Sequence, residues 1–203
     1  EFHRNLLESL RQPLESGQVL IARARGHLSL PASFIFMAAM NPCPCGYYGD
    51  SKKECLCTAH AVLQYQKKIS GPLLDRIDIQ ITVPRVALAD LRNKGHHQQK
   101  SESEKAREKI LEARNIQRKR LQGLKTKKKI FTNAEMTSKQ CDQLIALSQG
   151  AEAFMEKVFA KSLLSARGYF RILKVAQTIA DLEASAIVEE SHLSEAFGYR
   201  LRE

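Results

Sequence analysis

Four of the five cysteines in this 203-residue chain lie close together. They form two Cys-x-Cys pairs, Cys43 with Cys45 and Cys55 with Cys57, with nine residues between the pairs. Two such pairs on one loop can place four thiolates around one tetrahedral ion, and four protein ligands leave no open position for catalysis. The spacing therefore predicts a structural Zn²⁺ site. Free thiols or a redox pair are the alternatives, and His60 is a candidate substitute for one ligand.

Asn41 and Arg76 stand at positions suited to contact with a phosphate. Asn41 follows an uninterrupted apolar run, residues 34–40, and α/β sheets bind ligands beyond the carboxyl ends of their strands. Arg76 directly precedes an alternating segment, and its planar cation can stabilise charge on a phosphoryl group. The residues alone leave alternatives open, because Asn41 could simply turn the chain and Arg76 could pair with Asp75 or Asp78.

Arg167 is a further candidate, in the first turn of a helix that Ser165 is expected to cap. A cation at that position is unfavourable to the helix dipole, so an anionic ligand would explain its presence. Arg171, one turn later, is the second choice. A surface role is the alternative for Arg167.

Residues 18–30 are typical of a β-hairpin with Gly26 in its turn. Arg23, Arg25 and His27 alternate near the tip of this hairpin. Cations on an exposed tip suit contact with nucleic-acid phosphates. The alternative is that these residues lie on the surface and only make the protein soluble.

These candidates need strands and helices to position them. Residues 34–40 fit a strand buried on both faces, and residues 77–83 alternate apolar and polar side chains as a strand does. Helices are predicted over about 2–14, 59–69 and 101–121, the last of these opened by a capping box of Ser101 and Glu104. An all-helical region is predicted from 131, with a last helix from Ser191 to about Leu201. Within it, one helix is marked by Leu144, Ile145 and Leu147, and the helix after Ser165 has apolar residues at helical spacing: Tyr169, Ile172, Leu173, Ala176, Ile179 and Ala180. The helix from Ser101 carries only a thin apolar stripe of Ile110, Leu111 and Leu121, which predicts weak packing or contact with a partner.

The net charge of +10 is unevenly distributed. Residues 100–129 hold twelve Lys and Arg against four Glu, an excess of +8. A polyanion, above all nucleic acid, is the simplest partner for such a segment, and a solvated helix with a linker is the alternative. No apolar run approaches the roughly 18 residues of a membrane span and no signal region is present, so a cytoplasmic protein without membrane contact is expected.

Three stretches resemble the magnesium-chelatase-like branch of the AAA+ ATPases, and within it the ComM/YifB family of natural transformation. They are A-A-M-N-P-C-P-C-G at 38–46, S-G-P-L-L-D-R-I-D at 70–78, and L-S-A-R-G-Y-F-R-I-L-K-V-A-Q-T-I-A-D-L at 164–182. The resemblance implies an α/β plus all-α fold. Residues 1–85 would be the C-terminal half of an AAA+ P-loop core with a four-cysteine loop insertion at about 42–60, followed by a basic connector at 86–130 and a helical lid bundle at 131–203.

The resemblance also implies roles for the candidate residues. Asn41 would position the attacking water, Arg76 would act as an arginine finger on a neighbouring subunit, and Arg167 or Arg171 would touch the nucleotide phosphates. The hairpin residues would grip DNA in the pore of a ring. The implied protein is a homo-hexameric DNA helicase that uses ATP and Mg²⁺, acts on branched or single-stranded DNA, and drives branch migration in recombination.

Two other functions remain open at this point. A magnesium-chelatase-type motor for metal insertion or protein remodelling would use the same ATPase parts. A non-enzymatic, zinc-stapled DNA-binding module is the third reading. The sequence contains no G-x-x-x-x-G-K-[ST] and no Walker B strand, so this chain alone is expected neither to hydrolyse ATP nor to bind it tightly.

Overall fold

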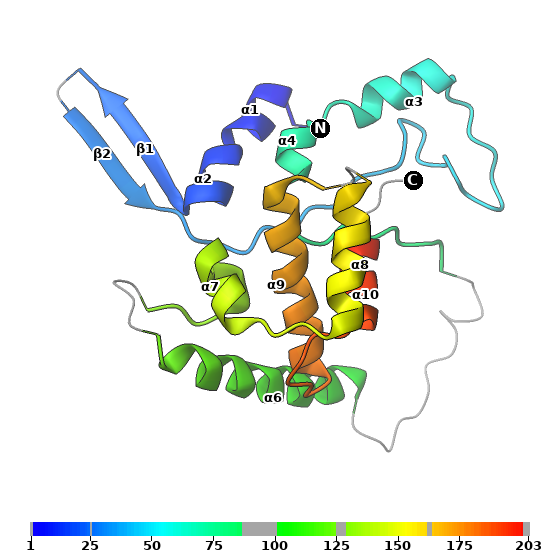
Figure 1. Ribbon diagram of the computed structural model, residues 1–203. Coiled ribbons are helices and arrows are strands. Elements are labelled where there is room, and N and C mark those ends of the chain that lie inside the picture. The colour runs from blue at the N-terminus through cyan, green and yellow to red at the C-terminus, as the bar shows by residue number, and fades with distance from the viewer. Residues whose placement is uncertain (1, 25, 87–100, 125–128, 162–163, 201–203) are drawn as a thin grey trace. The chain divides into compact units, whose positions relative to one another are not determined.

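The computed structural model describes residues 2–24, 26–86, 101–124, 129–161 and 164–200. The chain divides into two compact units. The first comprises Glu1–Ile77 with Thr82–Ala87, and the second comprises Asp78–Ile81 with Leu88–Glu203. Figure 1 shows that the first unit contains a hairpin and short helices, while the second is helical. The structure thus mixes helices with a small sheet.

The first unit begins with two short helices, α1 (Arg4–Ser9) and α2 (Arg11–Ser16), where the sequence predicted one. Pro13 has no N–H to donate to the carbonyl four residues earlier, which interrupts the hydrogen bonds of a continuous helix. At the break, the Leu10 N–H donates to the Leu7 carbonyl at 3.1 Å. Gly17, at φ +65°, then ends α2 in the left-handed conformation.

The predicted hairpin is confirmed. Strands β1 (Gln18–Arg23) and β2 (Gly26–Pro31) pair antiparallel, with Val19 opposite Leu30 and Ile21 opposite Leu28. Directly opposed residues share one face, so these apolar side chains line the same side of the hairpin. Gly26 has φ +149°, a conformation that a side chain would disfavour at the turn.

The two other predicted strands are absent, because β1 and β2 are the only strands among the described residues. Residues 34–40 and 77–83 contribute to no sheet, and Ile35 and Met37 are each 88% exposed. A lone strand leaves its N–H and C=O groups unpaired, and neither segment has a neighbouring strand in the described part of the chain. The prediction of a buried strand at 34–40 was wrong, because an apolar run forms such a strand only where partner strands are present.

Two capped helices complete the first unit. Helix α3 (Ala59–Gln66) begins after Thr58, whose side chain accepts from the Ala61 N–H. Helix α4 (Gly71–Leu74) begins after Ser70 in the same way, and Leu73 anchors it with 2% exposure.

The second unit is a helical bundle with the long helix α9 (Ala166–Leu182) at its centre. Its other elements are α6 (Glu102–Gln122), the 3-10 turn η1 (Asn133–Glu135), α7 (Ser138–Leu144), α8 (Gln149–Ala160) and α10 (Glu190–Gly198). Ile172, Leu173 and Ala176 of α9 are buried in one apolar core with residues of α7, α8 and α10. The predicted helical spacing on α9 is therefore confirmed. Among the described residues, no helix combines the length and hydrophobicity that crossing a bilayer would take.

Two predicted details of the bundle were wrong. Helix α7 ends at Leu144, and Leu147 instead pairs with Val188 in a parallel β-bridge. Helix α10 is capped by Glu189, whose N–H donates to Nδ1 of His192 at 2.9 Å, so it does not open at Ser191. A histidine completes this capping box in place of the usual Glu or Gln, which hid the signal. The predicted end at Leu201 lies outside the described residues.

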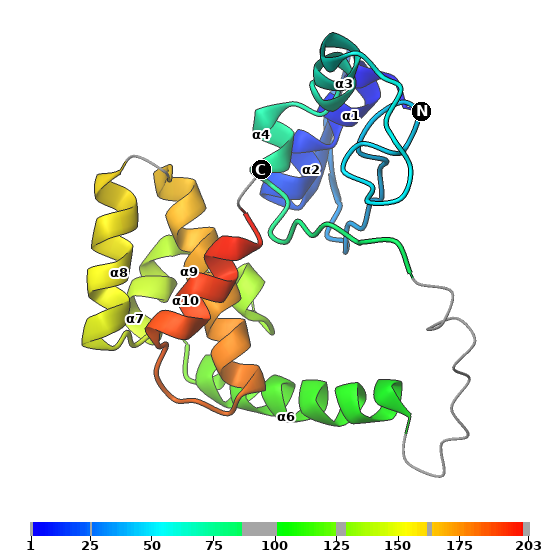
Figure 2. The same ribbon diagram turned by 90° about the vertical axis from the view of Figure 1, so that its right-hand side faces the viewer.

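Helix α6 packs more firmly than its thin stripe predicted. The capping box of Ser101 and Glu104 is present as expected, but Ile110 and Leu111 are 50% and 57% exposed. The residues that bury against the bundle are Ala113, Gln117 and Leu121. Figure 2 shows α6 crossing the C-terminal end of α9. The predicted boundary between connector and lid at 130/131 stays a prediction, although α6 lies in the same compact unit as α7, α8, α9 and α10.

A buried polar network joins α6 to α9. The Arg120 guanidinium donates to both carboxylate oxygens of Asp181, whose side chain is fully buried. The Asn133 amide donates to Asp181 at 2.8 Å and to Thr178 at 3.0 Å, and the Gln177 amide donates to Asp181 at 3.1 Å. A buried charge with all of its partners present is tolerated, whereas losing one partner is costly.

Replacing Asp181 with alanine should therefore lower the free energy of unfolding by about 3–5 kcal/mol, because Arg120 would stay buried without its carboxylate. Asp142→Ala, at an exposed position of α7, is the matched control and should change stability by about 0.5 kcal/mol or less. Urea denaturation followed by circular dichroism measures both. A double variant, Arg120→Met with Asp181→Leu, should recover only part of the loss, because the buried amides of Asn133 and Gln177 would still lack the Asp181 acceptor. Equal free energies of unfolding for Asp181→Ala and Asp142→Ala would contradict a stabilising role of the network.

Candidate functional site

The four clustered cysteines come together at one point of the first unit. The Cys43 Sγ lies 3.3 Å from the Cys45 Sγ and 3.7 Å from the Cys55 Sγ, and the latter two are 3.5 Å apart. All four sulfurs, including that of Cys57, lie within 4.8 Å of one another. Four sulfurs bound at about 2.3 Å around a tetrahedral ion are about 3.8 Å apart, so the cluster has the dimensions of a zinc site with four cysteine ligands. His60 is not part of it.

The loop that carries the cysteines is held mainly by backbone contacts. The Gly46 N–H donates to the Cys43 carbonyl at 3.1 Å, and the Tyr48 N–H points to the Cys43 sulfur at 3.4 Å. Asp50 accepts the N–H groups of Lys52 and Lys53 at 2.8 and 3.1 Å. Of residues 42–57, only Cys43 is buried. The loop has almost no apolar core of its own, which fits a segment organised by a metal.

The thiols differ in how readily they ionise. The Tyr47 N–H lowers the pKa of Cys45 to about 6. The pKa of Cys55 rises to about 12: the Cys57 N–H opposes this rise, but burial and the neighbouring thiols outweigh it. Without a cation, negative charge on one sulfur thus disfavours charge on the next. The donor set fits a divalent ion that binds thiolates.

Asn41 lies at the base of this loop. Its side chain is exposed, and a β-carbon added to Gly46 would stand 3.9 Å from the Asn41 amide group. Gly46 itself has φ +83°, which requires glycine. The structure therefore places Asn41 against the turn between Cys43 and Cys45, at the end of an extended segment that is not a strand here.

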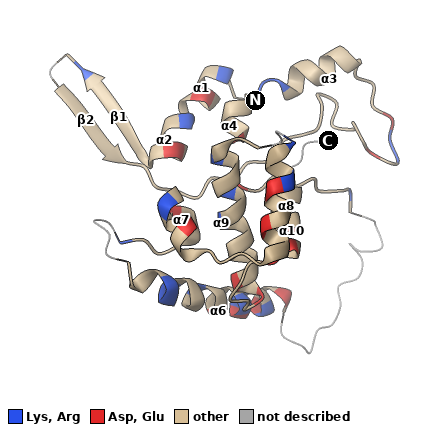
Figure 3. Ribbon diagram, viewed as in Figure 1, with Lys and Arg blue, Asp and Glu red and all other residues tan. Residues whose placement is uncertain are grey.

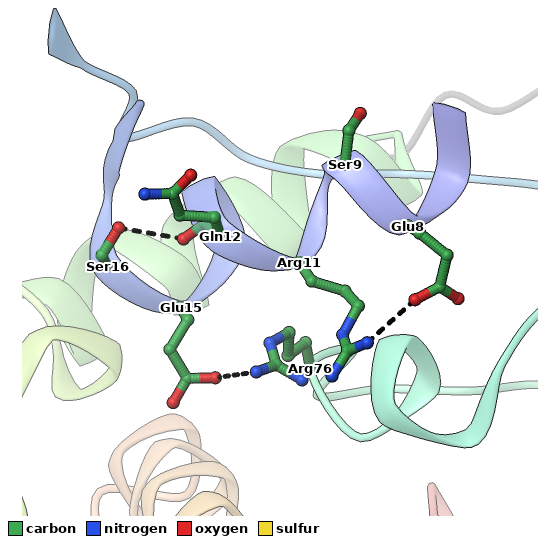
Figure 4. Close-up of a pocket in the computed structure, with 7 residues that line it drawn as sticks. All are labelled: Glu8, Ser9, Arg11, Gln12, Glu15, Ser16 and Arg76. Carbon is green, nitrogen blue, oxygen red and sulfur yellow. Dashed lines mark hydrogen bonds and ion pairs between the residues drawn. The ribbon is translucent and has the colours of Figure 1, made fainter. Parts of the chain in front are cut away.

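Arg76 lines a cavity of about 560 Å³ in the first unit. Figure 4 shows the lining: Glu8, Ser9, Arg11, Gln12, Glu15, Ser16 and Arg76. The Arg76 guanidinium pairs with Glu15 at 2.8 Å and donates to the Pro72 carbonyl at 2.6 Å, and its side chain is 11% exposed. Asn41 is not among the residues that line this cavity.

A second ion pair, between Arg11 and Glu8 at 2.9 Å, lies beside the first. Hydrogen bonds from Ser70 and Arg11 lower the pKa of Glu8, which keeps this carboxylate charged at neutral pH. The cavity thus holds two arginines and two carboxylates. Each arginine is already paired, so a phosphate at Arg76 would compete with the Glu15 carboxylate. No local pattern pointed to Glu15 as this partner, because it lies far from Arg76 along the chain.

The hairpin residues do not share one face. Arg23 pairs across the strands with Gly26, while His27 pairs with Ala22. Because side chains alternate between faces along a strand, Arg23 lies on the side of Val19 and Ile21, and His27 lies on the opposite side. Both are exposed, and Arg25 lies outside the described residues. The hairpin tip thus presents cationic or polar groups in two directions.

Arg167 and Arg171 lie one turn apart on α9 of the second unit. Arg167 is exposed in the first turn, next to the Ser165 cap, whose hydroxyl accepts from the Gly168 N–H at 3.1 Å. Arg171 pairs with Asp78 at 2.5 Å. Asp78 was one of two alternative partners considered for Arg76, and in the structure this carboxylate pairs with Arg171.

Sequence reasoning missed the polar line along α9, although its signal was present. Arg167, Arg171, Lys174, Thr178 and Asp181 recur every three or four residues on an otherwise apolar helix. Lys174 donates to the Ala134 carbonyl at 3.0 Å, and burial lowers its pKa. Polar residues at helical spacing within a buried helix indicate a second packed surface, and here that surface carries the Asp181 network.

Comparisons with known proteins agree with these features. Two family models match in succession, "Magnesium chelatase, subunit ChlI" over residues 1–91 and its C-terminal counterpart over residues 100–200. The competence protein ComM of Haemophilus influenzae is 40% identical over 200 residues, which cover 98% of this chain. The chain belongs to the magnesium-chelatase-like family of AAA+ proteins that includes ComM and YifB.

Other members of the magnesium-chelatase-like family are similar over the same extent. YifB of Escherichia coli, an uncharacterized protein, is 36% identical over 98% of this chain, and an uncharacterized protein of Mycobacterium bovis is 32% identical over 98%. The chain spans 37% of the length of ComM and of YifB. The matched region contains the cysteine loop, Arg76 and the helices of the second unit.

Proposed function

We propose that the complete protein is a hexameric AAA+ motor that uses ATP and Mg²⁺ to move on branched or single-stranded DNA, and that it drives branch migration in the cytoplasm. The observation that carries this proposal is the 40% identity to the competence protein ComM across 98% of the chain. The exposed Arg23 near the hairpin tip supports a DNA partner, since an exposed cation can contact phosphates without reading sequence.

In this proposal three residues serve ATP hydrolysis. Asn41 positions the attacking water. Arg76 exchanges Glu15 for the γ-phosphate of a nucleotide bound to the neighbouring subunit. Arg167 contacts the nucleotide phosphates from the lid, with Arg171 as the alternative. The phosphate cradle and the Mg²⁺ ligands would come from sequence outside this chain, which spans 37% of its ComM relative.

We also propose that the cysteine cluster holds a structural Zn²⁺. Cys43, Cys45, Cys55 and Cys57 would bind it as thiolates, and the ion would supply the loop with the stability that its few buried side chains do not. Because Asn41 lies against the Gly46 turn, the metal would also fix the base from which Asn41 projects.

A magnesium-chelatase-type motor is the second candidate, favoured by the description of both matching family models. It would use the same nucleotide-binding residues, but its partner would be a protein or a porphyrin, with no need for DNA. The DNA partner is therefore what separates the two candidates.

ATP hydrolysis by the complete purified protein tests the proposal. Turnover is measured without DNA, with linear duplex and with a branched four-strand junction, at equal nucleotide concentration. A DNA motor should hydrolyse ATP several times faster with DNA, and faster with the junction than with the duplex. Hydrolysis that is indifferent to both DNAs would contradict the DNA motor and favour the chelatase-type function.

A further inference from the structure

Helix α6 exposes two basic flanks, one on each side of the face that packs against α9. The packed face contains Ala113, Gln117 and Leu121. At about 100° per residue, Arg107, Arg114 and Arg118 fall within about 40° of one another on one flank. Lys105, Lys109 and Lys119 lie on the other flank. All six of these basic side chains are exposed.

The two flanks differ in their acidic neighbours. Glu112 falls among the three lysines and Glu108 lies within about 20° of Lys119, whereas no acidic residue falls within the arc of the three arginines. Among the residues that the structure describes, no carboxylate forms an ion pair with Arg107, Arg114 or Arg118. Figure 3 shows acidic residues toward the N-terminal end of α6 and basic residues alone at its other end.

The spacing of the arginines suits a polyanion with regular charges. Arg107 and Arg118 are eleven residues apart, which corresponds to about 16 Å along a helix axis. A DNA duplex rises about 3.4 Å per base pair, so the row could follow about five phosphates of one strand. Each guanidinium can bind a phosphate through two parallel N–H groups. The lysine flank offers the same number of cations, but its carboxylates offset their field.

We propose that Arg107, Arg114 and Arg118 form a second DNA-contact surface, separate from the hairpin, that binds the phosphate backbone of duplex DNA without reading its sequence. The choice of DNA among polyanions rests on the proposed motor function. The surface itself rests on three observations: the three arginines are exposed, they are aligned, and none of them is ion-paired with a described carboxylate. It would hold the duplex beside the bundle through α6, which the Arg120–Asp181 network fixes to α9.

Two matched triple variants of the complete protein test this inference. One changes Arg107, Arg114 and Arg118 to Gln, and the control changes Lys105, Lys109 and Lys119 to Gln. Both lose three charges from the same helix, and Gln has a helix propensity close to those of Arg and Lys. Fluorescence anisotropy with a short labelled duplex gives the Kd at several salt concentrations, and circular dichroism checks that both variants are folded.

The arginine variant should bind duplex at least about 10-fold more weakly and reduce the salt slope of log Kd by about 2–3, because about three phosphate contacts are lost. The lysine variant should change Kd by less than about 3-fold. Equal losses in the two variants, or no loss in the arginine variant, would overturn the inference. The inference would also be overturned if the arginine variant bound DNA with an unchanged Kd but no longer bound vesicles of phosphatidylcholine and phosphatidylserine. The three arginines would then contact a membrane surface.

This measurement is independent of ATP hydrolysis. If DNA does not stimulate turnover but the arginine variant still loses DNA affinity, the motor proposal fails and this surface stands. If DNA stimulates turnover and both triple variants bind DNA like the unchanged protein, the motor stands and this surface is refuted.

Discussion

Replacing Arg76 with alanine in the complete protein should lower the rate of ATP hydrolysis by about 10³-fold or more, with nucleotide binding much less affected. An arginine that stabilises charge on a transferring phosphoryl group contributes about 10³–10⁵ to the rate, because its effect is confined to the transition state. Steady-state ATPase assays give the rate, and a fluorescent nucleotide analogue gives the Kd. Arg76→Lys should rescue little, because an ammonium lacks the planar paired donors of a guanidinium.

The ion pair with Glu15 supplies the control, since Arg76 could instead serve only the packing of the first unit. A purely structural arginine would make Glu15→Gln about as harmful as Arg76→Ala. A finger released from Glu15 would leave the Glu15→Gln variant active, or more active, because the competing carboxylate is gone. Mixing Arg76→Ala subunits into the unchanged protein should lower the ATPase rate, because each variant subunit fails to supply its arginine to the nucleotide bound by its neighbour. Equal loss of activity in the two single variants would refute the finger.

Local features of this fold could be read from the sequence because their causes lie within a few residues. The hairpin followed from alternation around Gly26, the start of α6 from the Ser101 and Glu104 capping box, and the core face of α9 from its helical spacing. The cysteine cluster is also local, because two Cys-x-Cys pairs on one short loop necessarily lie close together. In each case the residues that form the sequence pattern are the same residues that form the structural feature.

Features that depend on distant partners could not be read in this way. Residues 34–40 have the pattern of a buried strand, but whether they form one depends on neighbours that no local pattern reveals. The partner of Arg76 is Glu15, from a helix at the other end of the unit's sequence, and the partner of Arg120 is Asp181. Charged residues are abundant, so many pairings satisfy electrostatics equally well, and only the packed structure selects among them.

Loss of the metal should have the other large effect. Cys43→Ser should reduce bound zinc from about one ion per chain to nearly none, because three thiolates bind the ion far more weakly than four. Lys52 and Lys53 are exposed within the loop, so trypsin can report its order. Since a structural zinc can contribute about 10 kcal/mol and each 1.4 kcal/mol is a factor of ten, cleavage there should become at least about 100-fold faster.

Cys141→Ser separates this effect from the general loss of a buried thiol. Cys141 is as fully buried as Cys43, but it lies in α7 and outside the cluster. Burying a hydroxyl there can weaken the bundle, yet zinc content and cleavage at Lys52 and Lys53 should stay unchanged. A chelator should reproduce the Cys43→Ser cleavage in the unchanged protein, and added zinc should reverse it. Protein purified under reducing conditions without zinc, whose loop nevertheless resists trypsin, would show that thiol contacts alone order the loop.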